Sequence, residues 1–290
     1  MSASQTFVQI FLYASNWNYQ LNLLFVLIAV VYLLLTGPLR KRFKDAEPVK
    51  GSKKTFFLTG LIIYYFAVGS PLDLLAHELF SMHMLQMALM YFVVSPLLLI
   101  GFPIYLYRAV LRLKPLKVVF KFLSRPLLTV VLFNGLLSLY HVPTVFNAIM
   151  NSEALHVISH TLLMVASIFM WWSIVSPVPE MDTLRTKHLT KIALIIGGTI
   201  LITPACALII FTDIVLFERF KEASEMVPLF SPLIDQQLGG VIMKVIQEIS
   251  FITAIGVILS RWFKNERKRD KEDLMQIQRE QQLRLSKNQV

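Results

Sequence analysis

Residues 19–42, YQLNLLFVLIAVVYLLLTGPLRKR, decide the fold class, because a long apolar run ends there in a cluster of basic residues. A helix of about 20 apolar residues crosses the hydrocarbon core of a bilayer. The cluster Arg40 to Arg42 is typical of the cytoplasmic flank of such a helix. No Lys or Arg occurs in the first 18 residues, so this segment does not resemble a cleavable signal peptide. We therefore expect a retained transmembrane helix.

The rest of the chain is equally apolar. Hydrophobic residues make up 56% of it and the mean hydropathy is +0.62, whereas soluble domains are roughly 45–50% apolar. The single cysteine, Cys206, excludes a disulfide within the chain, so helix packing must supply the stability. The pattern predicts an all-α, polytopic protein of the cell membrane, a seven-transmembrane helix bundle. The expected spans are residues 19–39, 55–72, 83–106, 126–140, 156–177, 191–217 and 239–262.

The links between these spans alternate in charge. Residues 40–54 hold seven Lys and Arg, residues 108–125 hold six and residues 180–191 hold three, whereas residues 73–82 and 141–155 hold none. Basic loops stay on the cytoplasmic side of a membrane. This rule predicts an N-terminus outside and a cytoplasmic C-terminus, which agrees with an odd number of spans.

Two domains follow from this reading: residues 1–262 form the seven-helix transmembrane domain, and residues 263–290 form a charged cytoplasmic tail. The tail begins with NERKRDKED and has too few apolar residues for a packed core. The net charge of +10 suits basic loops beside a lipid bilayer and does not by itself indicate nucleic acid. No phosphate-binding loop or catalytic motif is present, so we expect a protein that is not an enzyme.

Histidines gather on one side of the predicted membrane. Of the six in the chain, only His188 lies among the inner basic residues, where a position facing lipid headgroups is expected. The other five lie at or near the outer ends of spans. They are His77, His83, His141, His156 and His160.

The spacing of these histidines indicates metal binding. His156 and His160 are four residues apart, so both imidazoles project from one face of a helix. The same interval separates His83 from Met87, while Pro143 should hold His141 at a helix end. Imidazole nitrogen with thioether sulfur favours copper, as Cu(I). Hydrogen bonding between helices and ordinary core packing of methionine remain open alternatives.

Acidic and amide residues accompany the histidines. Asp73 stands four residues before His77 and could orient its ring or cap the following helix. Asp235 and Gln236 precede the last span. Asp235 could accept a hydrogen bond from a ligating imidazole and fix its tautomer, or it could cap its own helix.

A charged pair is expected inside the last span. Lys244 and Glu248 are four residues apart, so they can form an ion pair on one helix face. Charges within a bilayer are costly and usually face the bundle interior. A structural lock and a proton or ion path are both compatible with this pair.

The order of these motifs resembles a known family. HELFSMHMLQM at residues 77–87, YHVPTVFNAIMNSEALHVISH at 140–160 and DQQLGG at 235–240 resemble the CtaG family of cytochrome c oxidase assembly factors, found in bacilli and other Gram-positive bacteria. The resemblance covers about residues 15–262. It implies a seven-helix membrane protein needed to form an active caa-type oxidase, by supplying or inserting copper.

The family's site positions carry over to this chain with one departure. Met87 stands where many relatives have a second histidine. The implied site positions are His77, His83, His141, His156, His160, Asp235, Gln236 and Gln237.

The leading hypothesis is a metallochaperone that holds Cu(I) in the outer His/Met cluster and passes it laterally to a nascent oxidase subunit. Cytochrome c oxidase subunits are the expected partners, together with an extracytoplasmic copper donor. A copper transporter would need donors that continue inward, and a haem-binding redox protein would use histidine pairs as axial ligands. Both remain alternatives.

Overall fold

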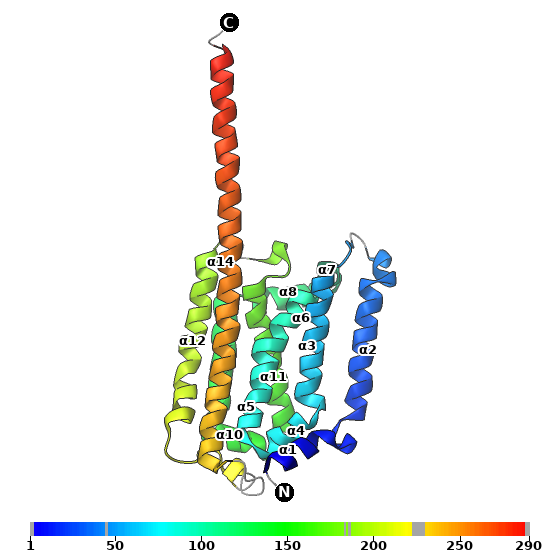
Figure 1. Cartoon of the computed structure of the whole chain (residues 1–290), viewed down its shortest axis with the longest axis vertical. Helices are drawn as coiled ribbons and strands as arrows, with labels where there is room; N and C mark the ends of the chain where they lie inside the picture. Colours follow the sequence, from blue (N-terminus) through cyan, green and yellow to red (C-terminus); the bar gives the residue numbers. More distant parts are fainter. Residues whose placement is uncertain (1–2, 44–45, 183, 185–186, 222–229, 288–290) are drawn as a thin grey trace.

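The computed structural model describes the chain except residues 1–2, 44–45, 183, 185–186, 222–229 and 288–290. In this described part, all regular secondary structure is helical and no strand occurs. The predicted all-α class is confirmed. Long helices run side by side along one direction, and short helices cover both ends of the bundle (Figure 1).

The long elements form the body of the bundle. They are α2 (Tyr19–Thr36), α3 (Gly51–Gly69), α5 (Phe80–Ala88) with the π-helix η3 (Leu89–Val94) and α6 (Ser95–Gly101), α9 (Pro126–Tyr140), α11 (Glu153–Val175), α12 (His188–Phe211) and α14 (Pro232–Lys287). The shorter helices connect or flank them. They are α1 (Ala3–Leu12), η1 (Ala14–Asn16), η2 (Pro38–Arg42), α4 (Pro71–Glu78), α7 (Ile104–Val110), α8 (Lys114–Leu123), α10 (Pro143–Met150) and η4 (Pro179–Met181).

Each of the seven predicted spans falls on a long element. Five stretches are long and apolar enough to cross a membrane alone, namely α2, the run from α5 to α6, α11, α12 and α14. Two bent pairs qualify when each is taken as one span: α3 with α4, bent by 50°, and α9 with α10, bent by 77°. The described helices therefore provide five to seven membrane-length segments.

The third and sixth predicted spans end well before the expected residue, whereas the first, second and fifth end only two or three residues early. The third ends at Gly101 because Phe102 precedes a proline and adopts extended backbone angles, as the steric clash with a proline ring requires. The sixth ends at Phe211, and the next residue, Thr212, is extended.

The run from α5 to α6 lies at the centre of the packing. It contacts α14, α3 and α11, while α9 packs between α11 and α12. The π-helix in this run leaves the carbonyl of Tyr91 free to accept from Ser167 Oγ at 2.6 Å and Trp171 Nε1 at 2.9 Å. Such π segments are frequent at functional sites. Here the segment fixes α5 and α6 against α11.

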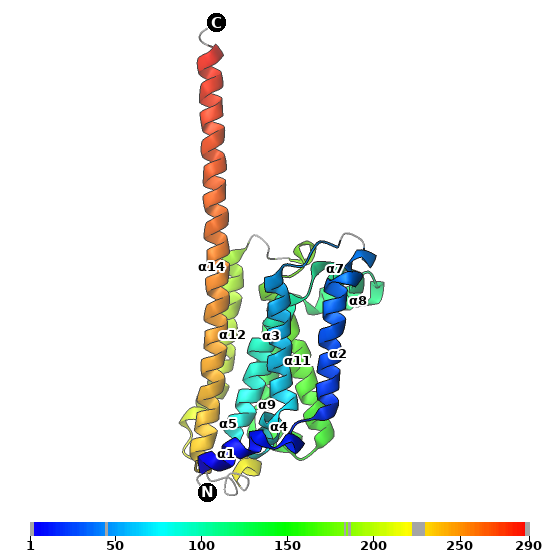
Figure 2. The same ribbon diagram turned by 45° about the vertical axis from the view of Figure 1, so that its right-hand side comes forward.

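Helix α2 stands at the edge of the bundle, beside α3 (Figure 2). Only 11% of its apolar window is buried, so most of its surface can face lipid. Its inner contact is aromatic and polar: the Tyr32 ring stacks on Phe57 at 3.8 Å, and the Tyr32 hydroxyl donates to the carbonyl of Gly101 at 2.9 Å.

Replacing Gly101 with alanine is expected to destabilise the bundle by about 1–3 kcal/mol, the range of overpacking substitutions. A Cβ at this position would lie 2.7 Å from the Phe57 Cα, so backbone would have to move. Thermal unfolding in detergent measures the effect. Gly135→Ala is the matched control, because a Cβ there meets no atom within 4 Å; equal melting temperatures for the two variants would contradict this packing.

Helix α14 continues far beyond the bundle. It passes Trp262 without a break and reaches Lys287, with an exposed, charged surface from residue 264 to 282. Figure 1 shows this extension leaving the end that also carries α7 and α8, while the N-terminus lies at the opposite end.

Candidate metal centre

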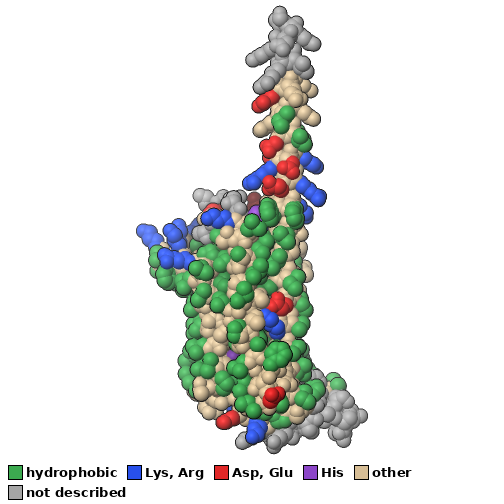
Figure 3. Space-filling view, turned by 90° about the vertical axis from the view of Figure 1, so that its left-hand side faces the viewer, with side chains coloured by type: hydrophobic (Ala, Val, Ile, Leu, Met, Phe, Trp, Pro, Cys, Tyr) green, Lys and Arg blue, Asp and Glu red, His purple; other side chains and the backbone are tan. Residues whose placement is uncertain are grey.

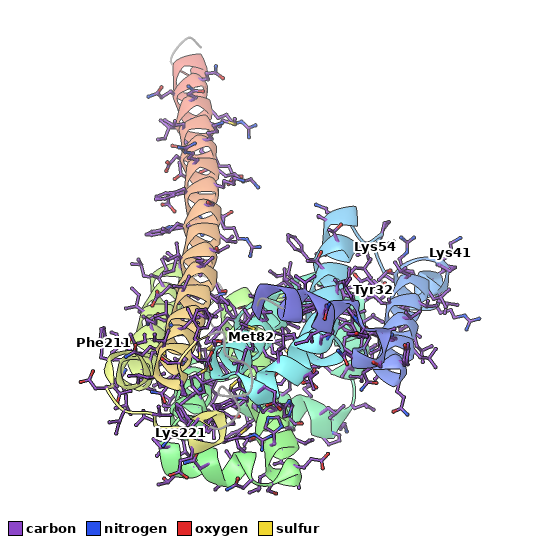
Figure 4. The ribbon with its side chains drawn as sticks, turned by 60° about the horizontal axis from the view of Figure 1, so that its bottom comes forward. Tyr32, Lys41, Lys54, Met82, Phe211 and Lys221 are labelled. Carbon is purple, nitrogen blue, oxygen red and sulfur yellow. The ribbon has the colours of Figure 1, made fainter. Side chains whose placement is uncertain are left out.

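Four segments meet at the end of the bundle opposite the long extension: α4, the start of α5, the junction of α9 with α10, and the first turns of α11 (Figure 1). Figure 4 looks onto this end and places Met82 of α5 near its middle. The five histidines predicted to lie on the outer side all belong to these segments.

Three imidazoles form a potential ligand set. His83 comes from α5, and His156 and His160 come from α11; one nitrogen of each lies within 4.8 Å of the others. The ring centroids are 4.3 Å apart for His156 and His160, and 5.5 Å apart for His83 and His160. An ion with metal–nitrogen bonds of about 2.0 Å holds its ligands roughly 3.3 Å apart. Small side-chain rotations would therefore close this set around one ion.

A tyrosine hydroxyl lies between two of these rings. The Tyr140 Oη atom is 3.1 Å from His83 Nε2 and 3.2 Å from His160 Nε2. Because a hydroxyl has one proton, it donates to one ring and accepts from the other. On the far side of His160, Nδ1 lies 3.3 Å from the Tyr91 hydroxyl. The sequence offered little sign of either tyrosine, apart from the position of Tyr140 next to His141.

His156 has an unpaired nitrogen. Its Nε2 atom is buried and has no hydrogen-bond partner among the residues that the structure describes. Buried polar atoms are nearly always paired, and this nitrogen is available to accept a hydrogen bond or to bind an ion. The predicted pair of His156 and His160 thus lies beside His83, and the Nε2 atom of His156 is available to bind a ligand.

His77 extends this row toward the surface. Its ring lies 5.3 Å from that of His156. Its Nδ1 atom is 2.8 Å from the carbonyl of Asp73; because a carbonyl only accepts, Nδ1 carries a proton, and Nε2 has a lone pair whenever the ring is neutral. An open pocket of about 350 Å³ reaches His77 and Asp73 from the side of Trp17.

The chain is extended at Leu79, so His77 belongs to α4, a helix separate from the one that carries His83. One expectation about this segment is corrected: Asp73 was considered as a cap of the following helix, but Ser70 caps α4. The Asp73 carboxylate instead accepts from Gln86 Nε2 at 2.7 Å.

His141 is not one of the three converging imidazoles. Its Nδ1 atom lies 2.7 Å from the carbonyl of Leu137, and its Nε2 atom lies 3.3 Å from the sulfur of Met84. Met87, the predicted sulfur ligand, is fully buried in the hydrophobic core. Met84 is buried in the same core, and its sulfur contacts the imidazole of His141.

Asp235 supports α5 rather than an imidazole. Its carboxylate accepts from the backbone N–H of Phe80 at 2.7 Å, and from both the backbone N–H and the hydroxyl of Ser81. Although it lies in the first turn of α14, it caps the N-terminus of α5. A carboxylate at a helix N-terminus is favourable. The contact fixes the helix that carries His83.

The neighbouring amides hold the loop that follows α12. Gln236 accepts from the backbone N–H of Leu216 at 2.7 Å and donates to the carbonyl of Ile214 at 3.2 Å. Gln237 donates to the carbonyl of Thr212 at 3.0 Å. The stretch from Asp235 to Gln237 therefore connects α14 to α5 through its aspartate and to this loop through its two glutamines.

Lys244 and Glu248 form an ion pair at 2.7 Å. The Lys244 Nζ atom also donates to Thr203 Oγ1 of α12 at 3.0 Å. Oppositely charged side chains lie side by side on an otherwise largely apolar face of the bundle (Figure 3). The contact of Lys244 with Thr203 joins α12 to α14, as expected of a structural lock. The alternative of a proton or ion path stays open.

Fold and site together define a class: an all-helical protein with five to seven membrane-length helices and a histidine cluster between them at one end. The chain belongs to the cytochrome c oxidase caa3 assembly factor family (Caa3_CtaG), whose family model matches residues 30–265. The resemblance seen in the motifs is confirmed, and all five clustered histidines lie inside the matched region. Comparisons with curated proteins and with solved structures find no significant match.

Proposed function

We propose that this protein is a multi-pass membrane assembly factor that carries copper, as Cu(I), on His83, His156 and His160 and transfers it to a nascent cytochrome c oxidase subunit. The observation that carries the proposal is the convergence of three imidazole nitrogens from two helices, with the Nε2 atom of His156 left without a partner. Membership of an oxidase assembly factor family supports the choice of recipient. Copper is the cargo here, and no catalytic step is needed.

We place the histidine end outside the cytoplasm. The basic residues of η2, α7 and α8 belong to the opposite end of the bundle, where α14 leaves it (Figure 1). Basic clusters mark the cytoplasmic side of membrane proteins. With seven spans, two of them bent, this orientation puts the N-terminus outside and the charged extension of α14 in the cytoplasm.

Copper would enter by ligand exchange along the row of rings. An open pocket lined by Asp73 and His77 adjoins the row, so an extracytoplasmic donor would deliver the ion there. From His77 the ion would move to His156 and then to the full set, because neighbouring centroids are only 4.3–5.5 Å apart. Each step keeps at least one imidazole on the ion.

The geometry favours a single ion over a haem. His83, His156 and His160 have centroid separations of 4.3–6.1 Å, and the Tyr140 hydroxyl lies between two of them. A haem would need an open slot between its two axial imidazoles for the porphyrin ring, and the Tyr140 hydroxyl occupies the gap between His83 and His160. The absorption spectrum of the purified protein tests this point, since a Soret band would contradict the copper proposal.

A titration of Cu(I) into the purified protein tests the proposal as a whole. In an oxygen-free solution with a chromogenic Cu(I) chelator, the wild-type protein is expected to withdraw copper from the chelator. A protein that never competes with the chelator, at any concentration in its measurable range, would overturn the proposal.

Tyr140→Phe is expected to bind Cu(I) about two- to tenfold more tightly than the wild type. The ion must displace the Tyr140 hydroxyl from the two Nε2 atoms that it bridges, and one such hydrogen bond contributes about 0.5–1.5 kcal/mol. The same titration measures the change. Tyr107→Phe is the control, because its hydroxyl donates to the Leu99 carbonyl instead. Weaker binding by Tyr140→Phe would mean that the tyrosine is itself a ligand.

A further inference from the structure

A second pair of donor atoms lies beside the three histidines. The Nε2 atom of His141 and the sulfur of Met84 are 3.3 Å apart, and both side chains are buried, with exposed fractions of 3% and 0%. His141 follows the last residue of α9, and Met84 lies in α5. The pair therefore joins two helices that are distant in sequence.

No proton can lie between these two atoms when His141 is neutral. The carbonyl of Leu137 at 2.7 Å accepts from His141 Nδ1, which must therefore carry the ring proton. The Nε2 atom then presents a lone pair, and a thioether sulfur has no proton to donate. Two electron-pair donors thus face each other away from water. A cation between or beside them would turn this contact into a favourable one.

The pair adjoins the three-histidine set through the chain itself. Met84 follows His83 on α5, and His141 follows Tyr140, whose hydroxyl bridges His83 and His160. On the other side of the pair lies α14. A Cβ at Gly239 would come within 3.1 Å of Met84 Cγ, so this glycine leaves the space that the methionine occupies.

We propose that Met84 and His141 form a second binding position for a soft monovalent cation, Cu(I). Thioether sulfur selects Cu(I) over harder divalent ions, so this position is more selective than three imidazoles alone. A role in which this position receives copper from the three histidines rests on the proposed function. The existence of the binding position does not depend on that function.

Copper K-edge absorption and metal content of the full-length protein, saturated with Cu(I) in oxygen-free detergent solution, test this proposal. The wild type is expected to bind more than one copper per chain and to show a sulfur neighbour at about 2.3 Å, a usual metal–sulfur distance. Met84→Leu, which conserves volume, is expected to lose the sulfur signal and one equivalent of copper. Met87→Leu, a substitution at an equally buried position of the same helix, is expected to keep both the sulfur signal and the copper content of the wild type.

The possible failures are distinguishable. A nitrogen-only environment in the wild type, or a sulfur signal that survives in Met84→Leu, would overturn the second position. His156→Ala reports separately on the first position: it is expected to lose one equivalent and keep the sulfur signal. If His156→Ala binds as much copper as the wild type, the three-histidine proposal fails whatever the sulfur signal shows.

Discussion

Replacing His160 with alanine is expected to weaken Cu(I) binding at the three-histidine set by at least about 100-fold and to prevent formation of active oxidase. His160 is the central ring of the set, since its centroid lies 4.3 Å from that of His156 and 5.5 Å from that of His83. Loss of residues that merely orient metal ligands already costs 10–100-fold in affinity. Loss of a ligand should cost more. Chelator competition measures the affinity, and oxidase activity in complemented membranes measures assembly.

His188→Ala is the matched control for this experiment. His188 is the first residue of α12, and its ring stacks on Trp262 at 6.1 Å. It is expected to keep both copper binding and oxidase assembly. A His160→Ala protein with normal copper affinity but no oxidase activity would indicate that the histidines act as a scaffold. Normal copper affinity together with normal oxidase activity would show that His160 is not needed for copper binding or for oxidase assembly.

Replacing Asp235 with alanine is expected to destabilise the protein by on the order of 3 kcal/mol or more. The carboxylate is only 1% exposed and accepts from Phe80 and Ser81 at the start of α5. Its removal leaves buried donors unpaired, each at a cost of about 1–3 kcal/mol. Thermal unfolding in detergent measures the loss. Asp213→Ala, an exposed acid in the loop before α14, is expected to unfold like the wild type.

Two further readouts separate support of the helix from a direct role at the metal. Asp235→Asn keeps one acceptor oxygen but turns an amide N–H toward a backbone donor, so an intermediate stability is expected. Copper added to Asp235→Ala should partly restore its melting temperature, because binding to the folded state stabilises it. An unchanged melting temperature together with lost copper binding would instead place Asp235 at the metal.

The sequence was sufficient to predict the long helices of the bundle, whereas α8 and α10 lie in segments that were expected to be links. Apolar runs of about 20 residues and alternating basic links depend on composition alone, and each predicted span lies on a long element. Local breaks were harder to foresee. The backbone is extended at Leu79, and the π-helix at residues 89–94 leads into Pro96, whose ring clashes with the preceding turn of an α-helix. Hydropathy carries no information about such local breaks.

The part of the candidate site that lies on a single helix could be predicted from the sequence. The four-residue interval between His156 and His160 put both rings on one face of α11. The same rule favoured Met87 as the partner of His83, which stays a prediction, whereas the contact between the sulfur of Met84 and another ring was not predicted. That ring, His141, comes from another helix, and spacing along one helix does not show which side chain meets a distant one. The bridging hydroxyl of Tyr140 was missed for the same reason.

The most direct test is the copper content of the wild type beside a His156→Ala/His160→Ala double variant, both purified from copper-replete cells in which caa-type oxidase activity is also measured. We predict more than one copper per chain in the wild type. In the double variant we predict the loss of the copper bound by the three histidines, together with the loss of oxidase activity. A double variant with as much copper as the wild type and normal oxidase activity would contradict copper delivery by these histidines.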